Sequence, residues 1–71
     1  MDINELKEEA KRAWVAYGES IRKAFGFSGS IEAGPLLRAI EKDDEQTIEA
    51  FILEVKELTD RMERMRKRFS P

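Results

Sequence analysis

Eight apolar residues recur at helical spacing, three or four positions apart except for one adjacent pair, through the C-terminal part of this 71-residue chain. They are Ile48, Phe51, Ile52, Val55, Leu58, Met62, Met65 and Phe69. This spacing places the side chains on one face of an α-helix, which we predict over residues 44–69 with a length of about 39 Å. A stripe of this length has to be covered by other helices, so it predicts an all-α fold.

A second long helix is predicted in the N-terminal part of the chain. Its apolar stripe consists of Ile3, Leu6, Ala10, Ala13, Tyr17 and Ala24. Asp2 and Glu5 are spaced as a capping pair in front of this stripe, and Gly26 suits the left-handed conformation that ends many helices. We therefore predict a helix over residues 3–25, about 34 Å long, with Phe27 folding back over its last turn.

Between the long helices lies a glycine-rich break, followed by a short helix. The break contains three of the chain's four glycines. Pro35 suits the first turn of a helix, so a short middle helix is predicted over residues 35–42. Asp43 and Gln46 are spaced as the capping pair of the last helix. We expect the three helices to form a three-helix bundle in a single domain, residues 1–71.

Charged residues are distributed unevenly along the chain. Segment 61–71 carries five basic residues against Glu63, and the remaining residues carry a net charge of −6. An antiparallel hairpin of the long helices would place this basic segment beside Glu5, Glu8 and Glu9 at the acidic start of the first helix. It would also place the basic end of the first helix beside the acidic start of the last. We therefore predict an antiparallel hairpin, although each exposed ion pair contributes only about 0–1 kcal/mol.

Part of the apolar stripe on the last helix has no third helix to cover it. The middle helix spans about 12–18 Å, roughly half the length of either long helix. With 22 large apolar side chains and no cysteine, the chain also has little stability to spare as a monomer, because ordering each residue costs about 1.5 kcal/mol. We therefore expect a homodimer or binding to a helix of another protein. The predicted interface residues are Trp14, Tyr17, Leu58, Met62, Met65 and Phe69.

Residue types that support catalysis or metal binding are scarce. The chain has no histidine and no cysteine, which removes the commonest general bases, nucleophiles and zinc ligands. Residues 29–34 have the glycine spacing of a phosphate-binding loop, but Pro35 and Leu36 replace its Lys-Ser/Thr pair. A calcium loop starting at Asp43 would need glycine where Ile48 stands. We therefore expect no enzymatic activity, no cofactor and no bound metal.

The basic C-terminal segment suggests an alternative function. Its phosphate-binding candidates are Arg61, Arg64, Arg66, Lys67 and Arg68. Clustered arginine and lysine bind the phosphate backbone of nucleic acids. Against this, the net charge is −2, and the last helix is longer than a typical recognition helix. Nucleic-acid binding is therefore the second hypothesis.

The leading hypothesis is a small helical protein–protein interaction or self-association module. The longest uncharged stretches are far shorter than a membrane-spanning helix, and the acidic N-terminal residues do not resemble a signal peptide. We therefore expect a cytoplasmic protein with no membrane partner.

Overall fold

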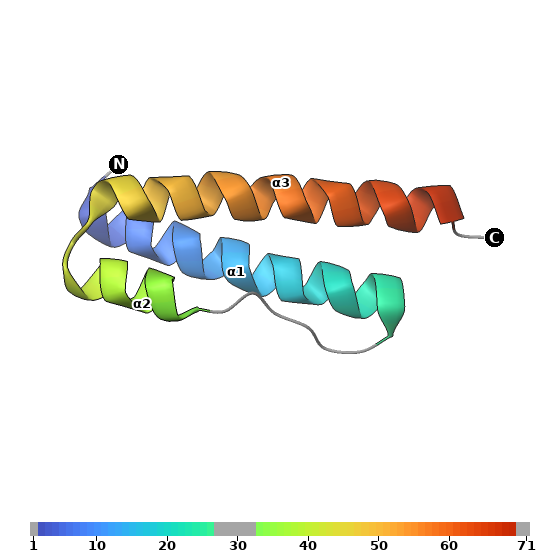
Figure 1. Cartoon of the computed structure of the whole chain (residues 1–71), viewed down its shortest axis with the longest axis horizontal. Coiled ribbons are helices and arrows are strands. Elements are labelled where there is room, and N and C mark those ends of the chain that lie inside the picture. The colour runs from blue at the N-terminus through green and yellow to red at the C-terminus, as the bar shows by residue number, and fades with distance from the viewer. Residues whose placement is uncertain (1, 27–32, 70–71) are drawn as a thin grey trace.

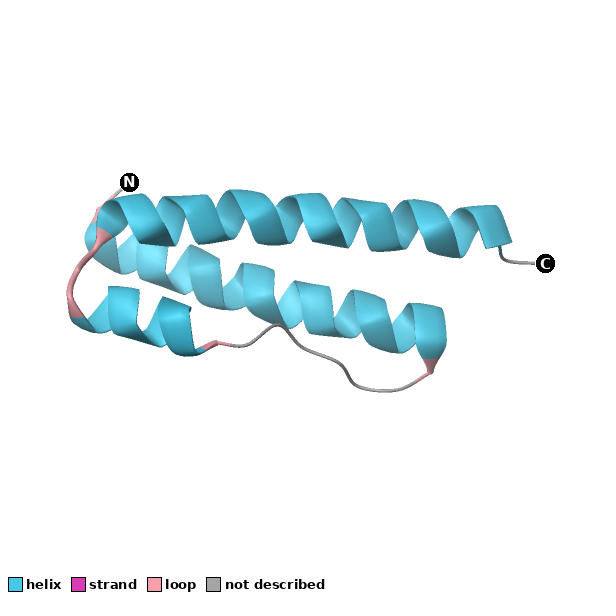
Figure 2. Ribbon diagram, in the orientation of Figure 1, coloured by secondary structure: helices cyan, strands magenta, loops and turns pink. Residues whose placement is uncertain are grey.

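The computed structural model describes residues 2–26 and 33–69, and within these ranges the chain forms three helices and no strand (Figures 1 and 2). The helices are α1 (Ile3–Phe25), α2 (Gly34–Glu41) and α3 (Glu45–Phe69). The all-α prediction is confirmed, and each predicted helix bound lies within one residue of the observed bound.

Both ends of α1 form as expected. The Asp2 carboxylate accepts a hydrogen bond from the Glu5 backbone N–H at 2.9 Å. At the other end, Gly26 has a φ of 77°, and its N–H donates to the Arg22 carbonyl at 2.8 Å. Glycine adopts this left-handed conformation at little cost, so the helix ends there. The predicted contact of Phe27 lies outside the described residues.

The cap of α3 lies one residue after the predicted position. Asp43 has a φ of 53°, and its carboxylate pairs with Lys7. Asp44 takes the capping position, where its carboxylate accepts from the Thr47 N–H at 3.2 Å and from the Thr47 hydroxyl at 2.6 Å. The predicted pair of Asp43 and Gln46 is therefore wrong, because the tight turn after α2 uses Asp43 as its left-handed residue.

α1 and α3 run in the same direction, and α2, which lies between them in the sequence, runs in the opposite direction (Figure 1). Contacts between the long helices show this parallel register. The Lys56 ammonium lies 2.8 Å from the Glu9 carboxylate, and the Ser20 hydroxyl donates to Glu63 at 3.4 Å. Residues further along α1 therefore meet residues further along α3, and the predicted antiparallel hairpin is wrong.

The connection explains the direction of the long helices. α2 lies against the end of the bundle where α1 begins, so α3 starts again from that same end (Figure 1). Successive helices alternate in direction, which makes the first and third parallel. Exposed ion pairs, worth about 0–1 kcal/mol each, are too weak to override this connection.

The core lies where α2 packs with α1 and α3. It consists of Leu6, Ala10, Leu36, Ala39, Ile48 and Ile52, with Ile3, Ile40 and Phe51 packed against it. Further along, the contact between α1 and α3 buries Ala13, Ser20 and Val55. The small side chains of Ala10 and Ala13 allow α1 to approach α3 closely.

Candidate protein-interaction face

α2 covers only one end of the pair formed by α1 and α3 (Figures 1 and 2). Its 8 residues span about 12 Å, whereas the 23 residues of α1 span about 34 Å. We call the end with α2 and the core the closed half. The open half comprises residues 13–25 of α1 and residues 55–69 of α3. Within the described residues, no third helix packs on the open half.

The apolar stripe of α3 continues into the open half on the side that faces the core. Phe51 marks this side, because it packs against the core cluster. Four predicted interface residues follow it: Leu58, Met62, Met65 and Phe69. At 100° per residue, all four side chains lie within about 40° of Phe51 around the helix axis. Leu58 and Met62 are half-buried, whereas Met65 is 43% exposed and Phe69 is 75% exposed. Exposure therefore rises toward the C-terminal end of the stripe.

α1 contributes apolar side chains to the same side. Ile3 packs against the core cluster. At 100° per residue, Trp14 and Ile21 lie on nearly the same face of α1 as Ile3, and Phe25 and Tyr17 lie about 40° to either side of it. Trp14, Tyr17 and Ile21 are half-buried, and Phe25 is 50% exposed. The structure therefore brings the six predicted interface residues to one side of the open half.

Four exposed apolar side chains were not predicted from the sequence: Val15, Phe25, Leu37 and Leu53. Phe25 follows Ile21 by four residues, so its place on the same face of α1 follows from the helix period. Leu37 stands next to Leu36, and adjacent residues point about 100° apart in a helix. Leu36 is accordingly 2% exposed in the core, whereas Leu37 is 57% exposed on the outer surface of α2.

The parallel register gathers charges of like sign at each end of the molecule. The acidic end, residues 2–9 and 41–49, holds nine acidic residues and two lysines. The basic end, residues 19–25 and 61–69, holds seven basic residues and two glutamates. These signs suit the helix dipoles, because the N-termini of α1 and α3 both lie at the acidic end. One molecule therefore carries opposite charge at its two ends.

The five basic residues of the nucleic-acid hypothesis are all exposed at the basic end. Arg61 and Arg66 pair with glutamates of α3 at 3.1 and 2.9 Å. The hydrogen bond from Arg66 lowers the pKa of Glu63, so this carboxylate stays ionised. Within the described part of the chain, the other three form no ion pair. Arg22 and Lys23 lie at this end as well, so their predicted place beside the acidic start of α3 is wrong.

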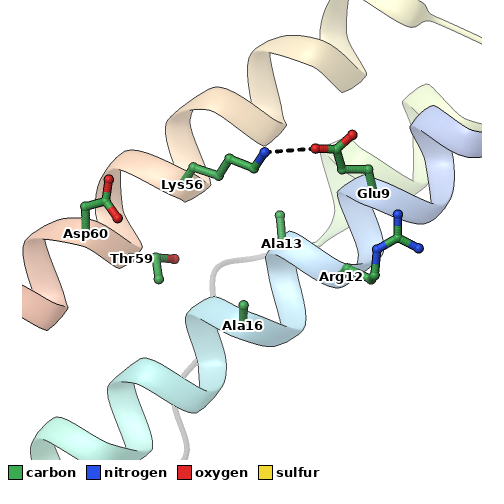
Figure 3. Close-up of a pocket in the computed structure, with 7 residues that line it drawn as sticks. All are labelled: Glu9, Arg12, Ala13, Ala16, Lys56, Thr59 and Asp60. Carbon is green, nitrogen blue, oxygen red and sulfur yellow. Dashed lines mark hydrogen bonds and ion pairs between the residues drawn. The ribbon is translucent and has the colours of Figure 1, made fainter. Parts of the chain in front are cut away.

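A shallow hollow of about 550 Å³ lies between α1 and α3, on the side away from α2. It is lined by Glu9, Arg12, Ala13, Ala16, Lys56, Thr59 and Asp60 (Figure 3). Lys56 reaches from α3 to Glu9, and its hydrogen bond and charge lower the pKa of that carboxyl group. The Thr59 hydroxyl donates to the Val55 carbonyl at 2.8 Å. Glu9, Lys56 and Thr59 therefore already have hydrogen-bond partners within the bundle.

The described part of the chain shows neither a metal-binding cluster nor a membrane-spanning helix. Among residues 2–26 and 33–69, no group of three or more potential ligand side chains is placed to hold a metal ion. No described helix combines the length and apolarity needed to cross a bilayer. Comparison with models of known protein families, with curated proteins and with solved structures finds no match to this chain. The open half and the charged ends are therefore the features from which a function is inferred.

Proposed function

We propose that this chain is a helical protein–protein interaction module whose binding face is the open half. One observation carries the proposal: the stripe of α3 that packs in the core of the closed half becomes steadily more exposed along the open half, from half-buried Leu58 and Met62 to Phe69 at 75%. A soluble protein that exposes such a stripe generally covers it with a partner. Trp14 and Tyr17 are of the types that dominate binding energies at interfaces. The flexible side chains of Met62 and Met65 adapt readily to a partner surface.

The open half is tested by making it polar without changing its charge. The double variant Met65→Gln/Phe69→Gln removes two exposed apolar groups and keeps residues that tolerate a helix. At micromolar concentrations we expect the wild type to associate in light scattering and, when dilute, to bind an apolar fluorescent dye. The affinity of the double variant for itself and for the dye should be lower by at least about tenfold, because each removed side chain would be buried by a partner.

Leu53→Gln is the matched control for this experiment. Leu53 is 70% exposed but lies on the face of α3 that points away from α1 and α2. Its association and dye binding should match those of the wild type, and circular dichroism checks that all variants remain helical. If the double variant also matches the wild type in both measurements, the open half is not a binding face.

A second candidate function is nucleic-acid binding through the basic end. It is favoured by the clustering of seven basic residues against two glutamates at that end. Arg64, Lys67 and Arg68 are exposed and, among the described residues, form no ion pair that would compete with phosphate. The acidic end repels a phosphate backbone, so contact would be confined to the basic end.

This second candidate predicts loss of binding in the triple variant Arg64→Ala/Arg66→Ala/Arg68→Ala. Gel shifts at several salt concentrations should show weaker binding and a flatter salt dependence, because fewer phosphates are neutralised. The triple variant Lys11→Ala/Arg12→Ala/Arg38→Ala makes the same change in charge away from the basic end. A shift that survives the first variant, or that both variants abolish equally, would remove this candidate.

A further inference from the structure

We infer that the open half binds a second copy of this chain, packed antiparallel about a two-fold axis, with α2 of each copy lying on the open half of the other. The inference rests on the proposed function and names the partner. Three features of the molecule carry it: the position of α2, the exposure of Leu37 and the separation of charge.

Among the described residues, no helix lies beside the open half on the side that carries α2. α2 occupies one end of the α1–α3 pair, and the open half continues at the other end on the same side (Figure 1). A two-fold axis perpendicular to the long helices exchanges these ends. The second α2 then lies over the open half of the first copy, and the first α2 lies over the open half of the second. Both open halves are covered by one self-complementary contact, as a two-fold dimer requires.

Leu37 gives α2 an apolar group on its outer surface. The inner face of α2 is already used, because Leu36 and Ala39 are 2% and 4% exposed in the core. Leu37 lies about 100° around α2 from Leu36, outside this core, and is 57% exposed. In the antiparallel dimer it faces the open half of the second copy, where Met65 and Phe69 are exposed. A short helix with apolar residues on both faces suits a middle layer between two helix pairs.

Charge selects the antiparallel arrangement over a parallel one. In the antiparallel dimer, the basic end of each copy lies against the acidic end of the other, at both ends of the assembly. A parallel dimer would place ends of like charge against each other. It would add to the repulsion that already exists between like charges at each end of a single chain. Opposite charges that meet across an interface favour one orientation over the other. Because salt screens such charges beyond about 8 Å at physiological ionic strength, the affinity should fall as salt rises.

Distances between copies test the orientation directly. The chain has no cysteine, so single spin labels can be attached through Asn4→Cys or Lys67→Cys. Both positions are exposed, and they lie at opposite ends, about 30 Å apart along the helix axis. In the antiparallel dimer, mixing the two labelled chains should give an Asn4-to-Lys67 distance between copies that is shorter than either like-to-like distance.

The outcomes separate this inference from the proposed function. Short like-to-like distances would show a parallel dimer and overturn the inference while leaving the open half as the binding face. A mass of 8.2 kDa at every concentration would also overturn it, and dye binding by the open half would then decide the proposed function alone. A dimer that Met65→Gln/Phe69→Gln does not weaken would overturn both.

Leu37→Gln tests the role of α2 separately. If α2 lies on the open half of the second copy, this change should weaken dimerisation about tenfold or more. It should leave the dilute monomer equally stable, because Leu37 lies outside the core. Leu53→Gln again serves as the control, with unchanged dimerisation. Equal affinity of the Leu37→Gln variant and the wild type would exclude α2 from the interface and contradict the inferred arrangement.

Discussion

The closed and open halves of this molecule share the same two long helices but differ in what covers them. In the closed half, α2 completes a core in which Ile48 is fully buried. In the open half, the continuation of the same stripe reaches the surface, where Met65 is 43% exposed. The hydrophobic period of α3 is nearly constant along its length. The length of the neighbouring helix, rather than the stripe itself, therefore decides which apolar residues form a core and which form a binding face.

The largest expected effect is on the free energy of unfolding, when one apolar side chain of α3 is shortened to alanine in each half. Ile48 and Met62 lie 14 residues apart, on nearly the same face of α3. Ile48→Ala should lower the free energy of unfolding of the monomer by about 2–5 kcal/mol, because it leaves a cavity in the core. Met62→Ala should lower it by only about 1 kcal/mol, because its side chain is half-buried. Urea denaturation of dilute protein measures both, and equal losses would contradict the division into halves.

A smaller effect is expected at the end of α1 in the open half. Gly26→Ala should lower the free energy of unfolding by about 1 kcal/mol, because alanine is strained at a positive φ. Among the described residues other than its chain neighbours, no atom lies within 4 Å of the place where a Cβ on Gly26 would stand. The loss therefore reflects the backbone conformation rather than a clash with these residues. Gly26→Asn is the control and should lower the free energy of unfolding by less, since asparagine tolerates this conformation better than alanine does. Equal losses for alanine and asparagine in thermal denaturation would show that the left-handed cap is not the cause.

The smallest predicted effect lies at the start of α3 in the closed half and depends on pH. The hydrogen bonds from Thr47, its hydroxyl first, lower the pKa of Asp44 below its ordinary value of 3.8. Because the folded pKa is the lower one, the ionised carboxylate stabilises the fold above pH 3.8, and this contribution disappears as the pH falls through the folded pKa. Asp44→Asn keeps the cap but cannot ionise, so the wild type should be more stable at pH 6 and lose its advantage at low pH.

Denaturation curves from pH 2 to pH 6 check this dependence. Thr47→Val removes the hydrogen bond from the hydroxyl but keeps the one from the backbone N–H. It should therefore reduce the pH-dependent contribution of Asp44 to stability without abolishing it. A difference between wild type and Asp44→Asn that stays constant over the whole range would contradict the assignment of Asp44 as the cap.

The helices themselves could be predicted from the sequence because their signals are local. Stripe spacing, the Asp2 cap and Gly26 each act within a few residues, and α1 has the predicted bounds. The cap of α3 was misplaced by one residue, because Asp43 and Asp44 are chemically alike and the tight turn decides between them. In a sequence, adjacent acidic residues give no sign of which one takes the left-handed conformation.

The direction of the long helices could not be predicted from charge. Helix dipoles favour acidic residues at the start and basic residues at the end of every helix, whatever its neighbours do. The match between the acidic start of α1 and the basic end of α3 therefore carried no information about packing. The six predicted interface residues follow from helix period alone, and the structure places them on one side of the open half. Their role in binding stays a prediction, as do the cytoplasmic location and the absence of catalysis.

Amide hydrogen exchange at two protein concentrations tests the central claim most directly. In dilute protein, amides of α1 and α3 in the closed half should exchange slowly, and those in the open half should exchange faster, because little packing there opposes local opening. At concentrations where the chain associates, protection should rise in the open half and stay nearly constant in the closed half. Equal protection of the two halves in the dilute monomer, or association that leaves exchange in the open half unchanged, would contradict the account.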